Sequence, residues 1–317
     1  MNRVAHPYAK VGRPLVFAHR GASGSAPENT YAAFAMAIEM GADALETDVH
    51  WTKDGVIVVA HDADVSRMTN GQGRIEDLTY DELHELDFGY RFTRDGGESY
   101  PYRGQGLTVM RFQDLLREFP DVPINVDVKP KAPPLLGQYI REMYESNGVD
   151  RVMTASFHYS VLKQLRQQNT NLSTSAAPRE IVSLLLRQRL GLGVGRAGEI
   201  SAEVSPTQVG STGASPTGVS GSWVNGAGGG SNAPYQALQV PPEMYGIRVV
   251  TEGFVRAAHQ RGAQVHVWTV DTAEEMNRLL DIGVDGIMSN YPDRARLVVD
   301  AWTPPTVHVK SGATMHL

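Results

Sequence analysis

Short runs of apolar and β-branched residues alternate along this chain with segments whose apolar positions have helical spacing. The apolar runs predict strands, and the segments between most of them predict helices. Eight runs are each followed by a helical pattern and are expected as strands: 15–19, 44–49, 124–128, 152–155, 172–176, 235–240, 264–269 and 286–288. A ninth run, 56–60, follows the turn signal Lys53-Asp54-Gly55 and predicts the second arm of a hairpin.

This alternation predicts an α/β fold with a parallel sheet, and eight strand–helix units predict that the sheet closes into a TIM (β/α)8 barrel. A chain of 317 residues is long enough for one barrel of about 250 residues with additions. Periodicity alone leaves an open, doubly wound sheet possible. We expect one barrel domain over residues 1–301, followed by a C-terminal extension over 302–317.

The first helix is expected from about Thr30 to Met40, with Asn29 as its N-cap. The most apolar helical pattern begins at Ile181 and is interrupted by two arginines, so it predicts an outer helix of the barrel. No run of about 18 apolar residues occurs, and no membrane span is expected. The N-terminus has no uninterrupted apolar segment of the kind a secretory signal needs, so we expect a cytoplasmic protein.

Two segments exceed what a minimal barrel needs. Residues 62–106, between the second and third strands, are rich in polar and aromatic residues and are expected as an insertion that walls the substrate face. Residues 201–232 are dominated by Gly, Ser, Thr and Pro and are expected as a flexible loop. This loop follows a helix and precedes a strand, so it should emerge on the face opposite the active site.

Composition narrows the chemistry. The net charge of −6 argues against a nucleic-acid partner, although a few cations can still bind phosphate locally. The chain has no cysteine, so any metal must be held by oxygen or nitrogen ligands. Nothing in the sequence indicates an oligomeric state.

Three carboxylates are expected at one end of two strands. Glu46 and Asp48 are two residues apart on a predicted strand, so both side chains point to the same side. Asp127 shares one face of another strand with Asn125 and Lys129. Carboxylates at such a short distance repel each other, and a hard divalent cation between them would remove this repulsion. Mg²⁺ or Ca²⁺ would suit these ligands. The spacing alone is equally consistent with two carboxylates that are exposed to solvent at the end of the strand or paired with Arg or Lys.

Two histidines flank the acidic pair. His19 ends the first strand and precedes Arg20, whereas His61 ends the hairpin arm. Hydrolysis of a phosphodiester needs a base for the attacking oxygen and an acid for the leaving oxygen, and two histidines can serve both roles. Arg20 and Lys129 are candidates to hold phosphate oxygens.

These residues lie in a segment that resembles the glycerophosphodiester phosphodiesterase family. The ordered motifs are HRG, PENT, ExD, KDG and HD, within the run HRGASGSAPENTYAAFAMAIEMGADALETDVHWTKDGVIVVAHD. The likeness continues through VSRMTNGQGRIEDLTYDELHELDFG, NVDVKP, SFH, VHVWTVD and GVDGIMSNYPD. It therefore covers about residues 15–299, apart from the Gly/Ser-rich loop.

The resemblance implies a TIM barrel, a divalent metal, and hydrolysis of a small-molecule glycerophosphodiester to an alcohol and sn-glycerol 3-phosphate. The residues at the family's functional positions are His19 and His61 for acid–base catalysis, Glu46, Asp48 and Asp127 for the metal, and Arg20, Lys129 and Trp268 for phosphate and substrate. Trp268 on its residue type alone is as readily explained by core packing.

The chain departs from the family pattern at three places. The third-ligand position is often Glu in bacterial members and is Asp127 here, a glutamate expected near the site is replaced by Gln113 or missing, and the closing motif reads Ser289-Asn290-Tyr291-Pro292. Two alternative functions stay open. One is cleavage of lysophospholipids, with aromatic residues of the insertion forming an apolar entrance. The other is a barrel that binds phosphorylated ligands without catalysis.

Overall fold

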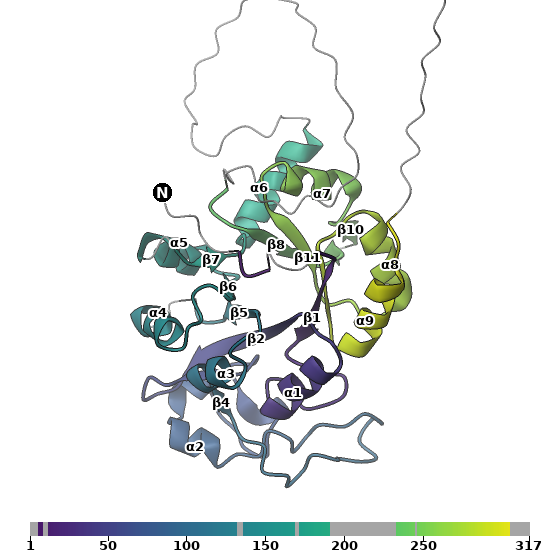
Figure 1. Cartoon of the computed structure of the whole chain (residues 1–317). Coiled ribbons are helices and arrows are strands. Elements are labelled where there is room, and N and C mark those ends of the chain that lie inside the picture. Colours follow the sequence, from purple (N-terminus) through teal and green to yellow (C-terminus); the bar gives the residue numbers. More distant parts are fainter. Residues whose placement is uncertain are drawn as a thin grey trace, which may run out of the picture.

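The computed structural model describes residues 6–8, 12–131, 136–168, 171–190, 233–244 and 246–304. Within them, eight parallel strands surround a common axis (Figure 1) in the order β7-β6-β5-β2-β1-β12-β11-β8. Their bounds are β1 Leu15–His19, β2 Ala44–Trp51, β5 Ile124–Val128, β6 Val152–Ala155, β7 Ser173–Thr174, β8 Ala237–Val240, β11 Gln264–Val267 and β12 Gly286–Ser289. A parallel bridge between Ser175 and Ala237 joins the two end strands, so the predicted barrel is confirmed.

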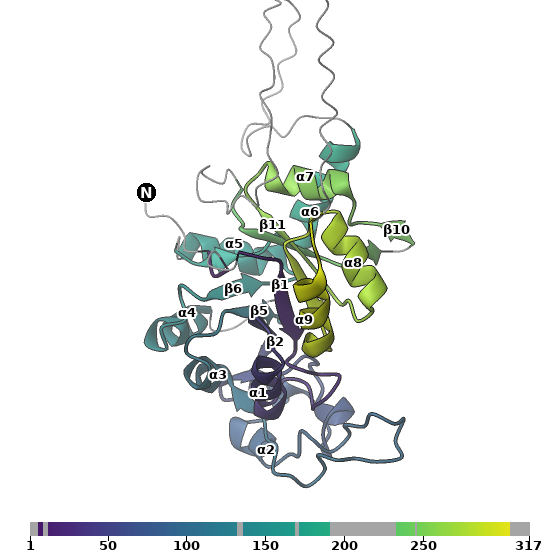
Figure 2. The same ribbon diagram turned by 45° about the vertical axis from the view of Figure 1, so that its right-hand side comes forward.

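A layer of helices covers the outside of this sheet (Figures 1 and 2). One helix follows each barrel strand, as the alternating pattern predicts. Their bounds are α1 Tyr31–Glu39, α3 Phe112–Glu118, α4 Leu136–Glu145, α5 Tyr159–Gln168, α6 Pro178–Arg189, α7 Glu252–His259, α8 Ala273–Asp281 and α9 Pro292–Ala301. Apolar side chains of the helices and of the outward strand positions pack together and are withdrawn from water, which is the main favourable contribution to folding.

The interior of the barrel is packed with side chains and is not a pore. Tyr8 enters it from the N-terminal segment and makes edge-to-face contacts with Phe17 and His266 at 5.0 and 5.3 Å between ring centroids. Met153 and Met288 belong to the same buried cluster. These side chains fill the barrel interior. A substrate can therefore bind only at an open end of the barrel, and the end formed by the carboxyl ends of the strands, here called the mouth, is where active sites of such barrels lie.

The predicted insertion after the second strand is confirmed. Strand β3 (Ile57–Val59) pairs antiparallel with β2 and with β4 (Met110–Arg111), and the chain between β3 and β4 forms the one-turn elements η1 Val65–Arg67 and η2 Ile75–Asp77 and the helix α2 Tyr80–His84. The insertion has its own apolar cluster, which includes Val65, Ile75, Leu83 and Phe88. It lies beside β1 and β2 at the bottom of Figure 1, next to the mouth.

The cap of α1 and one short hairpin differ from the sequence prediction. The N-cap of α1 is Thr30, whose side chain accepts a hydrogen bond from Ala33 N, and not Asn29. Asn29 adopts a left-handed backbone with φ of 59° and turns its side chain into the barrel mouth instead. A short hairpin of β9 (Glu243–Met244) and β10 (Ile247–Arg248) was not predicted. The Gly/Ser-rich loop 201–232 and extension residues 305–317 lie outside the described residues.

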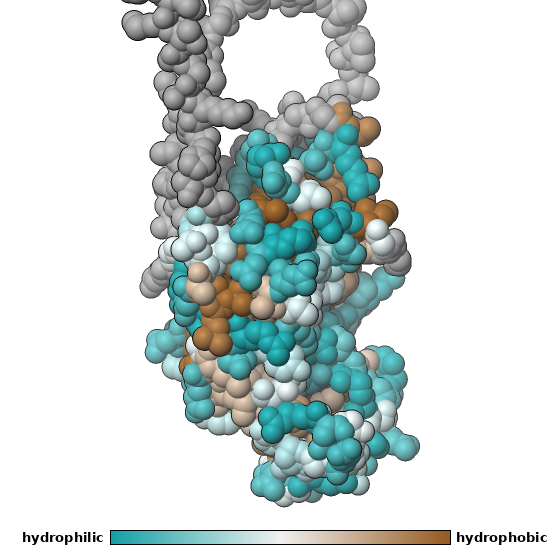
Figure 3. All heavy atoms as spheres, turned by 90° about the vertical axis from the view of Figure 1, so that its right-hand side faces the viewer, coloured by the Kyte–Doolittle hydropathy of each residue, from teal (hydrophilic) through white to brown (hydrophobic). Residues whose placement is uncertain are grey.

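The described surface is largely hydrophilic on the side of α8 and α9, with smaller apolar patches (Figure 3). Among the described helices, none combines the length and apolar character needed to cross a bilayer. The most exposed large apolar residue on α9 is Leu297, at 72%. Isolated residues of this kind are usual on a protein surface.

Arg151 ties the ends of α3 and α4 to the start of β6. Its guanidinium donates hydrogen bonds to the backbone carbonyls of Leu116, Phe119, Val122, Ser146 and Asn147. We expect Arg151→Met to lower the free energy of unfolding by about 2–3 kcal/mol, because several part-buried carbonyls lose a charged donor. Arg151→Lys should lose less, and Arg256→Met, which removes an exposed ion pair with Glu252, should show no measurable change in denaturant unfolding.

Candidate active site

The three predicted carboxylates meet at the carboxyl ends of β2 and β5. Asp48 and Asp127 are direct partners across these two parallel strands, and Glu46 lies two residues before Asp48 on the same side of β2. Their exposed fractions are 1% for Asp48 and 6% for Glu46 and Asp127. The strand register therefore places all three side chains in one small, buried volume.

Two cations compensate this buried charge. Lys129 Nζ lies 2.8 Å from Asp48 Oδ1 and 2.8 Å from Asp127 Oδ2, so it bridges the two strands. Arg20 follows β1 directly, and its Nε lies 3.5 Å from Asp48 Oδ2 while its backbone N–H donates to Glu46 Oε2 at 3.0 Å. Burial of three carboxylates is tolerable here because each has a cation or a donor within reach.

The protonation of the three acids is uneven. Burial, reinforced by repulsion from Asp48, raises the pKa of Glu46 well above its usual value. Burial also raises the pKa of Asp127, and the charge of Asp48 adds to this. For Asp48 the opposite holds, because Lys129 and Arg20 outweigh burial and lower its pKa. A further positive charge at this point would favour the ionised form of Glu46 and Asp127.

The donor set suits a hard divalent cation without being preassembled for one. Within the described part of the chain, no three His, Asp or Glu side chains already have the spacing of a metal site. Yet the buried Oδ1 of Asp127 has no hydrogen-bond partner. An orphaned carboxylate oxygen beside Glu46 and Asp48 is the type of ligand that Mg²⁺ or Ca²⁺ takes. The ligand chemistry of Glu46, Asp48 and Asp127 therefore fits the predicted metal.

His19 reaches the mouth from the end of β1. Its Nε2 lies 4.0 Å from Glu46 Oε2, and its Nδ1 lies 2.8 Å from Oδ1 of Asn290. Burial lowers the pKa of His19, and the neighbouring Arg20 lowers it further. A neutral imidazole with one nitrogen held and the other facing the carboxylates is suited to proton transfer.

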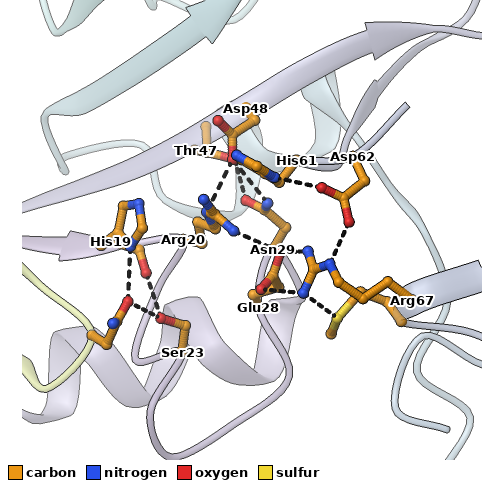
Figure 4. Close-up of polar contacts among 12 residues, drawn as sticks. His19, Arg20, Ser23, Glu28, Asn29, Thr47, Asp48, His61, Asp62 and Arg67 are labelled. Atoms are coloured by element: carbon orange, nitrogen blue, oxygen red, sulfur yellow. Dashed lines mark hydrogen bonds and ion pairs between the residues drawn. The ribbon is translucent and has the colours of Figure 1, made fainter. Parts of the chain in front are cut away.

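His61 lies beside Asp48 and is held by an ionic network (Figure 4). Its Nδ1 lies 2.7 Å from Asp62 Oδ1, and Asp62 also accepts a short hydrogen bond from Arg67 of the insertion. Arg67 in turn donates to both oxygens of Glu28, at 2.6 and 3.1 Å. The insertion therefore orients His61 through Arg67 and Asp62, which gives the extra segment a structural role at the site.

Asn29 links the carboxylates to the turn before α1. Its Nδ2 donates to Asp48 Oδ2 at 3.2 Å, and its Oδ1 accepts from Thr47 Oγ1 at 2.8 Å (Figure 4). Glu28 beside it accepts from Arg20 at 3.1 Å. The Pro-Glu-Asn-Thr segment thus contributes both a helix cap and two side chains that position Asp48 and Arg20.

Aromatic side chains border the mouth near Lys129. Trp268, directly after β11, packs edge-to-face on Phe157 with 6.1 Å between ring centroids, and Lys129 Nζ lies 5.8 Å from the centroid of Phe157. Phe157 is 57% exposed. Gln113 lies elsewhere, on the outer helix α3, where it donates to Glu145 of α4 at 3.2 Å. A substrate-contacting role at Gln113 is therefore not supported by its position.

The eight predicted site residues lie on strands or shortly after them. The structure brings seven of them to one mouth: His19, Arg20, Glu46, Asp48, His61, Asp127 and Lys129. Trp268 lies at the rim of this mouth. The sequence did not predict the supporting roles of Glu28, Asn29, Arg67, Asp271 and Asn290. The only sequence signal for Asn29 was its place in the PENT motif, where a cap was the simpler interpretation. Arg67 and Glu28 are 39 residues apart and His19 and Asn290 are 271 residues apart, so spacing along the chain carried no signal for these two contacts.

Comparison with known proteins identifies the family of this chain. Residues 19–294 match the Glycerophosphoryl diester phosphodiesterase family. A Glycerophosphodiester phosphodiesterase of Caldanaerobacter subterraneus subsp. tengcongensis is 30% identical over 285 residues, covering 89% of this chain and 96% of that protein. The residues matched by the family include both histidines and all three carboxylates.

Solved structures support the fold. The glycerophosphoryl diester phosphodiesterase domain of a Mycobacterium tuberculosis protein superimposes with a TM-score of 0.68 at 20% identity, covering 90% of this chain and 98% of that one. An Oleispira antarctica phosphodiesterase in complex with the product sn-glycerol-3-phosphate gives a TM-score of 0.66 at 20% identity, covering 92% of this chain and 99% of that one. At this identity the likeness establishes a shared architecture.

Proposed function

Since this chain belongs to the glycerophosphoryl diester phosphodiesterase family, we propose that it hydrolyses glycerophosphodiesters to an alcohol and sn-glycerol 3-phosphate. The single observation that carries this proposal is the convergence of two histidines on the buried carboxylates Glu46, Asp48 and Asp127: His19 Nε2 lies 4.0 Å from Glu46, and His61 lies beside Asp48 (Figure 4). This arrangement offers two proton-transfer groups next to a charged phosphate-binding centre.

The protein's own side chains account for most of the proposed mechanism. Arg20 and Lys129 bind the non-bridging oxygens of the phosphodiester and share the negative charge that increases in the transition state. One histidine accepts a proton from the nucleophile, which is water or the substrate's own glycerol hydroxyl. The other histidine donates a proton to the leaving oxygen. If the glycerol hydroxyl attacks first, water opens the resulting cyclic phosphodiester in a second step.

We propose that a divalent cation, Mg²⁺ or Ca²⁺, is held by Glu46, Asp48 and Asp127. When bound, it would add positive charge next to the phosphate and stabilise the transition state. Two features support this assignment: the partnerless Oδ1 of Asp127 and the raised pKa of Glu46. Both indicate a place where one more positive charge is favourable.

The contacts of the insertion favour a small glycerophosphodiester over a lysophospholipid. Phe88 and Phe92 are buried in the insertion itself, at 6% and 9% exposed. Arg103 Cζ lies over the rings of Tyr90 and Tyr100, at 4.2 and 3.8 Å from their centroids. These aromatics therefore stabilise the insertion and are not arranged as an open apolar entrance for an acyl chain.

A substrate panel tests the proposal. Purified protein is expected to release glycerol 3-phosphate from glycerophosphocholine and glycerophosphoethanolamine, to lose this activity in chelator, and to recover it when Mg²⁺ or Ca²⁺ is added back. Lysophosphatidylcholine should be a poorer substrate by kcat/KM. Faster cleavage of the lysolipid would establish the lysophospholipase alternative, and lack of turnover of every diester with every metal would favour a binding protein.

A further inference from the structure

Asn290 connects His19 to a second hydrogen-bond network at the end of β12. Its Oδ1 lies 2.8 Å from His19 Nδ1, and its Nδ2 donates to Asp271 Oδ2 at 2.7 Å. A carboxylate can only accept, so the Asn290 nitrogen must point to Asp271 and its oxygen to His19. The orientation of this amide is therefore fixed by chemistry and does not depend on how its two atoms were assigned.

Asp271 is itself held firmly. It lies between β11 and α8, and its Oδ1 accepts hydrogen bonds at 2.9 Å from Ser289 Oγ and from the backbone N–H of Asn290. Its backbone carbonyl accepts a short hydrogen bond from Arg294 of α9. Both carboxylate oxygens are thus occupied, and Asp271 cannot turn away from Asn290 without losing three bonds.

The turn after β1 holds Asn290 from the other side. Ser23 Oγ lies 2.8 Å from Asn290 Oδ1 and from the carbonyl of His19, and Gly24 N–H donates to the Asn290 carbonyl at 2.9 Å. A Cβ atom at Gly24 would lie only 2.3 Å from the Tyr291 ring. The two loops are therefore in direct contact, and the distance between His19 and Asn290 has little freedom.

We propose that Asn290, oriented by Asp271, is a positioning residue that keeps His19 in the tautomer with its proton on Nδ1. Nδ1 donates that proton to Asn290 Oδ1, which leaves Nε2, the nitrogen nearer Glu46, to exchange a proton with the substrate. The two histidines are thus oriented by different groups, a neutral amide for His19 and the carboxylate of Asp62 for His61. This inference rests on the proposed catalytic role of His19, but the tautomer is a property of the resting protein.

The tautomer can be measured directly. Full-length protein labelled with ¹⁵N-histidine and loaded with Mg²⁺ is examined by long-range ¹H–¹⁵N correlation, and the His19 signals are identified by their loss in His19→Gln. The wild type is expected to show the Nδ1–H pattern. The tautomer itself is read from the wild-type protein, so the result does not depend on whether the variants at Asp271 and Asn290 fold.

Asp271→Asn tests the relay. In this variant the side-chain oxygen still accepts from Ser289 and from the Asn290 backbone, so its NH₂ group faces the Asn290 side chain, whose own NH₂ group previously donated there. The Asn290 amide should therefore turn over, which presents its nitrogen to His19. We expect the His19 signals to change to the Nε2–H pattern and kcat to fall about 10²-fold with little change in KM, because binding residues are untouched. Asp293→Asn makes the same charge change on an exposed residue of α9 and should alter neither the tautomer nor kcat.

Exchanging the two groups should restore the arrangement. In the double variant Asp271→Asn with Asn290→Asp, the carboxylate at position 290 accepts from both His19 Nδ1 and the amide at position 271. Return of the Nδ1–H pattern and of most of the lost kcat would support the relay, since general packing damage would not be repaired by a second substitution. An Nε2–H pattern in the wild type, or an unchanged pattern in Asp271→Asn, would overturn the proposal. The Nδ1–H pattern together with full activity of His19→Gln would keep the positioning role and overturn the catalytic role of His19.

Discussion

His61→Ala is expected to lower kcat for glycerophosphocholine by about 10²- to 10⁴-fold while the protein stays folded. His61 is part-exposed, with 31% of its side chain accessible, so its removal leaves little buried space behind. The loss should therefore appear in turnover and not in stability. His19→Ala should have a comparable effect on turnover, because the reaction needs both a proton acceptor and a proton donor. Steady-state kinetics and thermal unfolding of each variant provide the measurement.

His84→Ala is the matched control for both histidine variants. His84 is an exposed residue of α2 in the insertion, and its ring contacts Tyr80 at 5.5 Å between centroids. Its replacement should leave kcat and KM unchanged. Near-normal turnover in purified, folded His19→Ala or His61→Ala would refute the two-histidine mechanism, whatever the metal requirement turns out to be.

Lys129→Met is expected to lower the free energy of unfolding by about 3–5 kcal/mol in the presence of chelator. The side chain of Lys129 bridges Asp48 and Asp127 with two contacts of 2.8 Å, and methionine keeps its length but not its charge. The two carboxylates would then be buried with one compensating cation fewer. Burial lowers the pKa of Lys129, but the two aspartates outweigh burial and raise it, which indicates that the ammonium is strongly favoured here.

Addition of Mg²⁺ should stabilise Lys129→Met more than it stabilises the wild type, because the cation would replace part of the missing charge. Denaturant unfolding with chelator and with Mg²⁺ separates the two contributions. Lys163→Met, on an exposed position of α5, controls for the change from lysine to methionine. Equal unfolding free energies for Lys129→Met and wild type in chelator would show that the carboxylates do not depend on Lys129 for their charge balance.

The sequence determined most of the architecture because local patterns carry it. Strands β1, β5 and β6 begin and end at the predicted residues, and the turn predicted at Lys53-Asp54-Gly55 is present, with Gly55 in a left-handed backbone at φ of 84°. The period of two along β2 was enough to place Glu46 and Asp48 on one side. The prediction failed at Asn29. Its residue type and position suited a helix N-cap, but the cap is Thr30 and Asn29 donates a hydrogen bond to Asp48 instead.

Only the tertiary structure decided which distant residues complete the site. Arg67 reaches Glu28, 39 residues away, because the insertion folds back next to β2. Asn290 reaches His19 because barrel closure makes the first strand, β1, a neighbour of the last, β12. Such contacts depend on sheet order and register, and these are set by the packing of the whole barrel. The sequence therefore predicted which residue types form the candidate site, whereas the tertiary structure determined how His19 and His61 are held, by barrel closure for His19 and by the fold of the insertion for His61.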